Sequence, residues 1–165
     1  DEALRTYDPR FKVNPPLRSE EHRAAVVDGL KDGTIDAIVT DHAPHTWDEK
    51  DQEFSLAPSG FVGLETSVGA VLTHLYHTGA VDLMTIIRAM STAPARLLGV
   101  DAGVIAEGKD ADLTIIDLNK EWTVDASSFY SKGKSSPFDE MIFTGKAVAT
   151  VVDGEFVMKD GVVLK

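Results

Sequence analysis

The sequence predicts an α/β unit over residues 1–100, followed by an all-β unit over residues 101–165. Before Val100, apolar residues at helical spacing alternate with a strand-like run. After it, only short β-type runs remain, and Asp153-Gly154 and Asp160-Gly161 separate the last of them, which is typical of hairpins. The whole chain of 165 residues is long enough for one domain with a sizeable core, or for a small domain plus part of another.

The first helix is expected to start after Ser19, because a serine N-cap followed by acidic residues stabilises a helix start. It runs to about Lys31 and should bury a face made of Ala24, Val27 and Leu30. Residues 37–40 are then expected to form a buried strand, and residues 42–60 a long polar loop. The order strand, helix, strand indicates parallel βαβ packing.

Three further helices are expected before Val100. One covers residues 65–76, one starts at the N-cap Asp82, and a short one over residues 95–98 ends at Gly99. In the all-β unit, the β-type runs are Val104-Ile105 and residues 113–116, 148–152, 156–157 and 162–164.

Composition narrows the class of partner. The net charge of -11 argues against nucleic acid or an anionic membrane surface as the main partner. No apolar stretch approaches the ~20 residues of a membrane-spanning helix, and no signal peptide is visible. The chain has no cysteine, which excludes disulfides and thiolate metal sites and fits a reducing, cytoplasmic location.

The segment Thr40-Asp41-His42-Ala43-Pro44-His45 carries the strongest chemical signal. It follows the expected strand directly and offers one carboxylate and two imidazoles, which are groups that bind zinc and move protons. A catalytic zinc needs about three protein ligands plus a water, so this segment is an incomplete site. His74 and His77 lie three residues apart near a helix end, and without a third ligand we expect them to be structural.

Several spaced motifs resemble the C-terminal portion of the dihydroorotases, which are cyclic amidohydrolases. The resemblance covers essentially the whole chain in order, on residues 12–18 (KVNPPLR), 40–45 (TDHAPH), 57–60 (APSG), 63–66 (GLET), 108–113 (GKDADL) and 135–138 (SSPF). It implies the C-terminal part of a TIM-type metal-dependent hydrolase barrel, followed by a small β-sandwich-like domain. A complete barrel takes ~250 residues, so we expect this chain to be a fragment that lacks the N-terminal part of the parent protein.

The resemblance also implies roles for five residues. Asp41 would be a metal ligand and the catalytic general acid/base. Asn14, His45 and the backbone N–H groups of Ser59 and Gly60 would bind the substrate. His42 is not expected to be a ligand; it would orient the loop or pack beside the end of the strand. From the residues alone, Asn14 could equally be a turn residue before proline, and Ser59 and Gly60 an ordinary turn.

The implied cofactor is zinc, whose other ligands would lie upstream of this fragment. The implied reaction is the interconversion of N-carbamoyl-L-aspartate and L-dihydroorotate in pyrimidine biosynthesis. The small-molecule substrate would be the main partner, with the missing N-terminal segment, a second copy, or aspartate carbamoyltransferase as protein partners. We expect the fragment alone to be inactive.

Two alternatives stay open at this point. Another cyclic amidohydrolase, such as a hydantoinase, dihydropyrimidinase or allantoinase, shares related motifs. A non-catalytic dihydroorotase-like scaffold subunit is the other alternative, although Asp41 and His45 are retained here.

Overall fold

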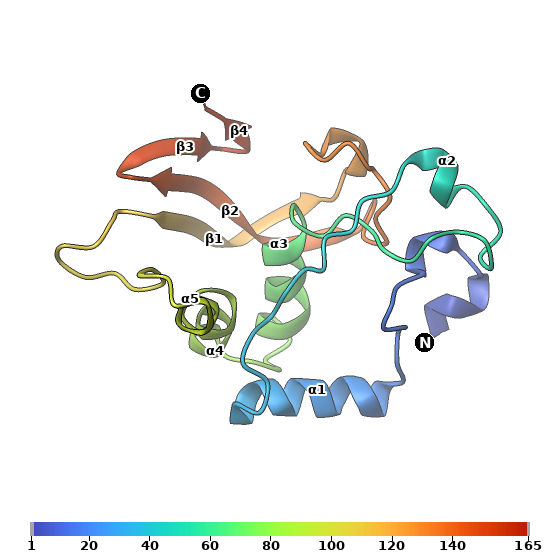
Figure 1. Cartoon of the computed structure of the whole chain (residues 1–165), viewed down its shortest axis with the longest axis horizontal. Coiled ribbons are helices and arrows are strands. Elements are labelled where there is room, and N and C mark those ends of the chain that lie inside the picture. Colours follow the sequence, from blue (N-terminus) through green and yellow to red (C-terminus); the bar gives the residue numbers. More distant parts are fainter. Residues whose placement is uncertain (1, 165) are drawn as a thin grey trace. The chain divides into compact units, whose positions relative to one another are not determined.

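The computed structural model describes residues 2–164 and contains short helices, long loops and one sheet (Figure 1). The helical elements are η1 (Glu2–Thr6), η2 (Pro9–Phe11), α1 (Glu20–Asp32), α2 (Trp47–Lys50), α3 (Ser67–Val71), the π-helical turn η3 (Leu72–Tyr76), α4 (Leu83–Ile87), the π-helical turn η4 (Arg88–Thr92), α5 (Ala93–Leu98) and η5 (Ala126–Ser128). The strands are β1 (Leu113–Thr123), β2 (Ile142–Val152), β3 (Glu155–Lys159) and β4 (Val162–Val163). Within the described residues, no helix has the length and apolar character that a bilayer crossing requires.

The chain forms two compact units, each assembled from separate stretches of sequence. The first unit comprises the residues up to Val26, Thr40–Ser67 and Thr123–Ile142. The second comprises Val27–Val39, Val68–Trp122 and the residues from Phe143 onward. The sheet therefore shares a unit with helices α3 to α5, and a separate all-β domain over residues 101–165 stays a prediction.

The second unit has a core of aliphatic side chains. The buried members are Leu30, Val81, Ile86 and Ala89, packed by further half-buried apolar residues. Two of its helix ends follow local sequence rules. Asp82 caps α4 by accepting a hydrogen bond from the Thr85 amide at 3.0 Å. Gly99 ends α5 with a left-handed φ of 68°, where glycine avoids the steric penalty of a Cβ atom.

The sheet has the order β1-β2-β3-β4, and β2–β3 and β3–β4 are antiparallel pairs. Asp153 and Gly154 both have positive φ, 51° and 82°, and so do Asp160 and Gly161, at 51° and 83°. Positive φ at both central residues defines the tight hairpin turn that matches strand twist. The two hairpins predicted from Asp-Gly are therefore confirmed.

The helices around η3 pack on this sheet through very close contacts. A Cβ atom on Gly69 would lie 2.8 Å from Phe143 and Trp122, and one on Gly145 would lie 2.5 Å from Leu72. The indole Nε1 of Trp122 donates to the Gly145 carbonyl at 3.0 Å. These glycines allow helix and sheet backbones to approach within the second unit.

The expected strand over residues 37–40 is wrong. The segment is extended but not part of a sheet, Val39 is 79% exposed, and the Ile38 amide donates to the Ala89 carbonyl at 3.0 Å. A parallel strand takes its hydrogen bonds from neighbouring strands, and among residues 2–164 every strand lies after residue 112. The βαβ unit and a strand at Val104-Ile105 are likewise absent from the described chain.

Candidate functional site

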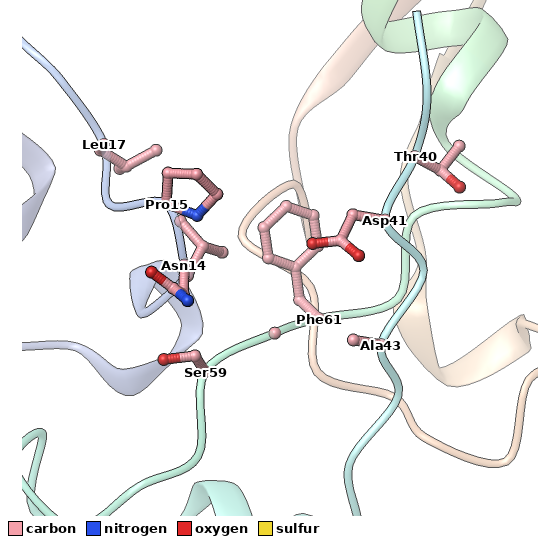
Figure 2. A pocket seen from close by; sticks show the side chains of 10 residues that line it. Asn14, Pro15, Leu17, Thr40, Asp41, Ala43, Ser59 and Phe61 are labelled. Carbon is pink, nitrogen blue, oxygen red and sulfur yellow. The ribbon is translucent and has the colours of Figure 1, made fainter.

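A pocket of about 420 Å³ in the first unit gathers most of the residues that the sequence singled out (Figure 2). Its wall is made by three chain segments, and the lining residues are Val13, Asn14, Pro15, Leu17, Thr40, Asp41, Ala43, Ser59, Gly60 and Phe61. Polar groups therefore converge on a largely apolar concave surface, which is the usual character of a small-molecule site.

Backbone hydrogen bonds join the three segments. The Ala43 amide donates to the Phe61 carbonyl at 3.0 Å, and the Gly60 amide donates to the Lys12 carbonyl at 2.9 Å. Behind the pocket, the Val62 amide donates to the Ser135 carbonyl at 3.0 Å. The wall is thus a connected structure, although its residues lie in irregular segments.

Asp41 is exposed in this pocket and has an unusual backbone. Its φ is 45°, in the left-handed region that few non-glycine residues occupy. Figure 2 shows its carboxylate projecting from its own segment toward the side of the pocket that carries Asn14 and Pro15. Such conformations cost about 1–3 kcal/mol and cluster at functional sites, so the outlier supports a functional role for this carboxylate.

Asn14 and Ser59 lie on the opposite side of the pocket from Asp41 (Figure 2). Both are exposed, and each carries hydrogen-bonding atoms into a wall that also contains Phe61. A carboxamide presents a donor edge and an acceptor edge together, which complements an imide or ureido group. The structure therefore brings four of the five predicted site residues, Asn14, Asp41, Ser59 and Gly60, to the wall of one pocket.

His45 lies beside this pocket and outside its wall. Its Nε2 atom is 2.9 Å from the Ser59 carbonyl oxygen, and its Nδ1 atom is 3.7 Å from the Glu49 carboxylate. Both ring nitrogens therefore face groups of the chain itself. The expectation that His45 donates directly to a ligand does not fit this conformation, because its Nε2–H group already donates a hydrogen bond to the Ser59 carbonyl.

The expectation that the Gly60 amide donates to a ligand needs the same correction. That N–H already donates to the Lys12 carbonyl. What Gly60 supplies is space: its φ is 121°, and a Cβ atom would lie 2.7 Å from the Ala43 Cβ and 3.2 Å from the His45 Nε2. Only glycine fits this close approach at this φ.

The remaining histidines have structural roles. His42 accepts hydrogen bonds at Nδ1 from the amides of Gly63, at 3.1 Å, and Leu64, at 3.3 Å, which agrees with the loop-orienting role expected for it. His77 contacts the Leu118 carbonyl through Nε2 at 2.8 Å, and His74 packs edge-on against Phe143. The structural interpretation of the His74 and His77 pair is thereby supported.

The described residues do not form a zinc site. Among residues 2–164, no group of three or more His, Cys, Asp or Glu side chains is placed to hold a metal ion. Asp41 alone offers one oxygen ligand, whereas zinc is held by about three or four protein ligands.

Lys50 was not singled out from the sequence, because it lies in the segment that was expected to be a long polar loop. The side chain is buried at the end of α2 and contacts the segment that forms the pocket wall. Thr46 and Glu49 form a capping box at the start of α2, and this Thr-x-x-Glu spacing could have revealed the helix. The burial itself depends on residues distant in sequence and has no local signal.

Comparison with known proteins defines the class of this fold and site. The family model of the amidohydrolase family matches residues 12–157. The chain therefore belongs to the amidohydrolase family. Over 99% of its length it also resembles the solved L-hydantoinase (dihydropyrimidinase) from Arthrobacter aurescens, with 37% identity and a TM-score of 0.94, covering 38% of that chain.

Curated relatives carry a more specific name. The dihydroorotase of Pelotomaculum thermopropionicum is 50% identical over 163 residues, and that of Bacillus subtilis is 46% identical over 165 residues. These alignments cover 99% and 100% of this chain. The chain spans 38% and 39% of the length of those two proteins.

Proposed function

We propose that the complete protein is a dihydroorotase, which reversibly cyclises N-carbamoyl-L-aspartate to L-dihydroorotate in pyrimidine biosynthesis. The observation that carries this proposal is the pocket in which the Asp41 carboxylate faces Asn14 and Ser59. It lies in a chain that is 44–50% identical to several curated dihydroorotases.

The proposed reaction requires a group that holds a proton. Ring opening adds water to an amide carbon, and the proton released must reach the leaving nitrogen. Asp41 is the carboxylate that lines the pocket, so we assign the proton transfer to it. Figure 2 shows this carboxylate projecting toward the side of the pocket that carries Asn14 and Pro15, which is where the proposal places the ring.

The substrate would be held by the opposite wall. The Asn14 carboxamide pairs its donor and acceptor edges with the ring imide, and Ser59 adds a hydrogen-bonding group beside it. His45 acts through its hydrogen bond to the Ser59 carbonyl, and Gly60 acts by letting its backbone lie close to Ala43. These assignments use only contacts within the first unit.

Zinc enters the proposal only for the complete protein. Asp41 would be the ligand that this chain contributes, and the other ligands would belong to the rest of the protein. Because one carboxylate does not retain zinc, we expect the 165-residue chain by itself to be inactive. In the complete protein, residues 1–100 would form part of the barrel and residues 101–165 part of a small β-sandwich-like domain.

The setting of the complete protein is also a proposal. We place it in the cytoplasm, with the small-molecule substrate as its main partner. A homodimer and an assembly with aspartate carbamoyltransferase are the protein partners that the proposal includes.

A substrate comparison tests the proposal. The complete protein would be assayed with dihydroorotate, hydantoin and allantoin at equal concentrations. Turnover of dihydroorotate at least about tenfold faster than of the others, in kcat/KM, supports the proposal. Turnover of hydantoin but not dihydroorotate would favour the second candidate function, that of a hydantoinase. The observation behind this candidate is the 37% identity to a solved L-hydantoinase. No turnover of any ring would favour a non-catalytic scaffold.

A further inference from the structure

Lys50 is a buried lysine whose ammonium group donates hydrogen bonds to the segment of residues 58–60. The residue is 4% exposed. Its Nζ atom donates to the Pro58 carbonyl at 3.0 Å and to the Gly60 carbonyl at 2.9 Å. One cation therefore holds the two carbonyls that flank Ser59.

The held segment is part of the pocket, whereas Lys50 is not. Ser59 and Gly60 line the pocket, Ser59 on the side opposite Asp41, and Lys50 is absent from the lining. Any effect of the lysine on a ligand must therefore pass through the backbone of residues 58–60. On the other side of Ser59, the His45 imidazole bonds to the Ser59 carbonyl, so three consecutive carbonyls are held by charged or polar side chains.

The backbone that carries Lys50 is fixed independently of this segment. The Thr46 side chain accepts from the Glu49 amide, and the Glu49 carboxylate accepts from the Thr46 amide at 2.9 Å. The Asp51 amide closes the turn by donating to the Trp47 carbonyl at 2.7 Å. The short helix α2 therefore fixes the backbone of Lys50 through local hydrogen bonds.

The environment of Lys50 strengthens its hydrogen bonds. Burial lowers the pKa of Lys50, the positive charge of Lys12 lowers it further, and Asp8 acts in the opposite direction. Burying a cation costs free energy unless its N–H groups are hydrogen-bonded, and the two carbonyls offset part of this desolvation cost. Removing the ammonium would release the segment without leaving a buried charge behind.

We propose that Lys50 is a positioning residue that fixes the Pro58–Gly60 backbone and thereby sets the substrate-binding wall opposite Asp41. This inference rests on the proposed function for its kinetic consequence. Its structural consequence, a rigid segment at residues 58–60, does not depend on which ring the protein opens.

Kinetics of the Lys50→Met variant in the complete protein provide the first test. We expect the KM for dihydroorotate to rise by about tenfold while kcat changes less than about threefold, because the wall is misplaced but the proton-transfer group is kept. A merely structural role would lower the fraction of active protein, so kcat would fall and KM would stay unchanged. That second result would overturn the proposal.

Lys12→Met is the matched control, because the Lys12 Nζ also donates to a carbonyl of the same loop, that of Ser55, at 3.1 Å. We expect its KM to stay within about twofold of the wild type. An equal rise of KM in both variants would contradict a specific role for Lys50. If Lys50→Met does not fold, Lys50→Gln decides, since its carboxamide keeps one donor group. Its KM should lie above that of the wild type but below the rise of about tenfold expected for full loss of the ammonium group, and a KM equal to that of the wild type would overturn the proposal.

Hydrogen exchange separates this proposal from the proposed function. The Gly60 amide should exchange at least about tenfold faster in Lys50→Met, and at the wild-type rate in Lys12→Met, whether or not dihydroorotate is turned over. Unchanged exchange at Gly60 would overturn the positioning role. If the wild type opens a different ring while Gly60 exchange responds as expected, only the proposed function fails.

Discussion

The Nδ1 atom of His42 lies 3.1 Å from the backbone nitrogen of Gly63. Thr40, the residue before Asp41, also packs closely on Gly63. A Cβ atom on Gly63 would lie 3.0 Å from the Thr40 carbonyl oxygen. Both neighbours of Asp41 in the chain therefore lie against Gly63. Asp41, between them, has a left-handed φ of 45°.

Replacing His42 should loosen this arrangement. We expect His42→Ala to lower the free energy of unfolding by about 1–2 kcal/mol, because it leaves the amide of the buried Gly63, and that of the exposed Leu64, without their acceptor. Urea denaturation of the complete protein measures the change. His42→Asn is the control, since its side-chain oxygen can take the place of Nδ1. Equal stability of the alanine variant and the wild type would contradict the assignment.

Gly60→Ala should damage the pocket by steric conflict. The new methyl group would lie 2.7 Å from the Ala43 Cβ at a φ of 121°, so we expect a loss of about 2 kcal/mol or more in unfolding free energy. Gly79→Ala is the matched control, because Gly79 also has a positive φ, 72°, but no atom within 4 Å of the position of a Cβ. Similar thermal midpoints for the two variants would show that the close approach at Gly60 is unimportant.

Acid should weaken the first unit through Asp8. A side-chain hydrogen bond from Arg10 lowers the pKa of Asp8, so the folded state binds this proton less tightly than the unfolded chain does. The stabilisation is then present above the unfolded pKa of about 3.9 and is lost as pH falls through the lower folded value. Thermal midpoints between pH 6 and pH 3, chosen around that value, should fall less steeply in Asp8→Asn than in the wild type. Parallel curves would exclude this contribution.

Local features of the sequence predicted local structure well. The helix expected from Ser19 to about Lys31 corresponds to α1, Glu20–Asp32, because caps and periodicity act within a few residues. The Asp-Gly turns and the N-cap Asp82 were confirmed for the same reason. Asp41, Asn14 and Ser59 were singled out from contiguous motifs and line one pocket, and their roles stay predictions.

Features that depend on distant residues could not be predicted from the sequence. The extended segment at Ile38 is not a strand, because strand hydrogen bonds come from a neighbour and not from β-branched side chains. The Gly60 amide was expected to donate to a ligand. It donates its hydrogen bond to the Lys12 carbonyl instead, which is far away in sequence. Lys50 is buried beside the Pro58 and Gly60 carbonyls, which accept its hydrogen bonds and lie eight and ten residues further along the chain.

The proton-transfer role of Asp41 is tested most directly by the steady-state kinetics of Asp41→Asn in the complete protein, with dihydroorotate as substrate. Asparagine tolerates the left-handed backbone and keeps the shape of the side chain, so the thermal midpoint should stay unchanged. Asp153→Asn is the matched control, because Asp153 has nearly the same backbone, with φ 51° against 45°, and lies in a hairpin turn. We predict that kcat falls by about 10³-fold in Asp41→Asn and is unaffected in Asp153→Asn. A folded Asp41→Asn protein that keeps kcat within about tenfold of the wild type would contradict the central role of this carboxylate.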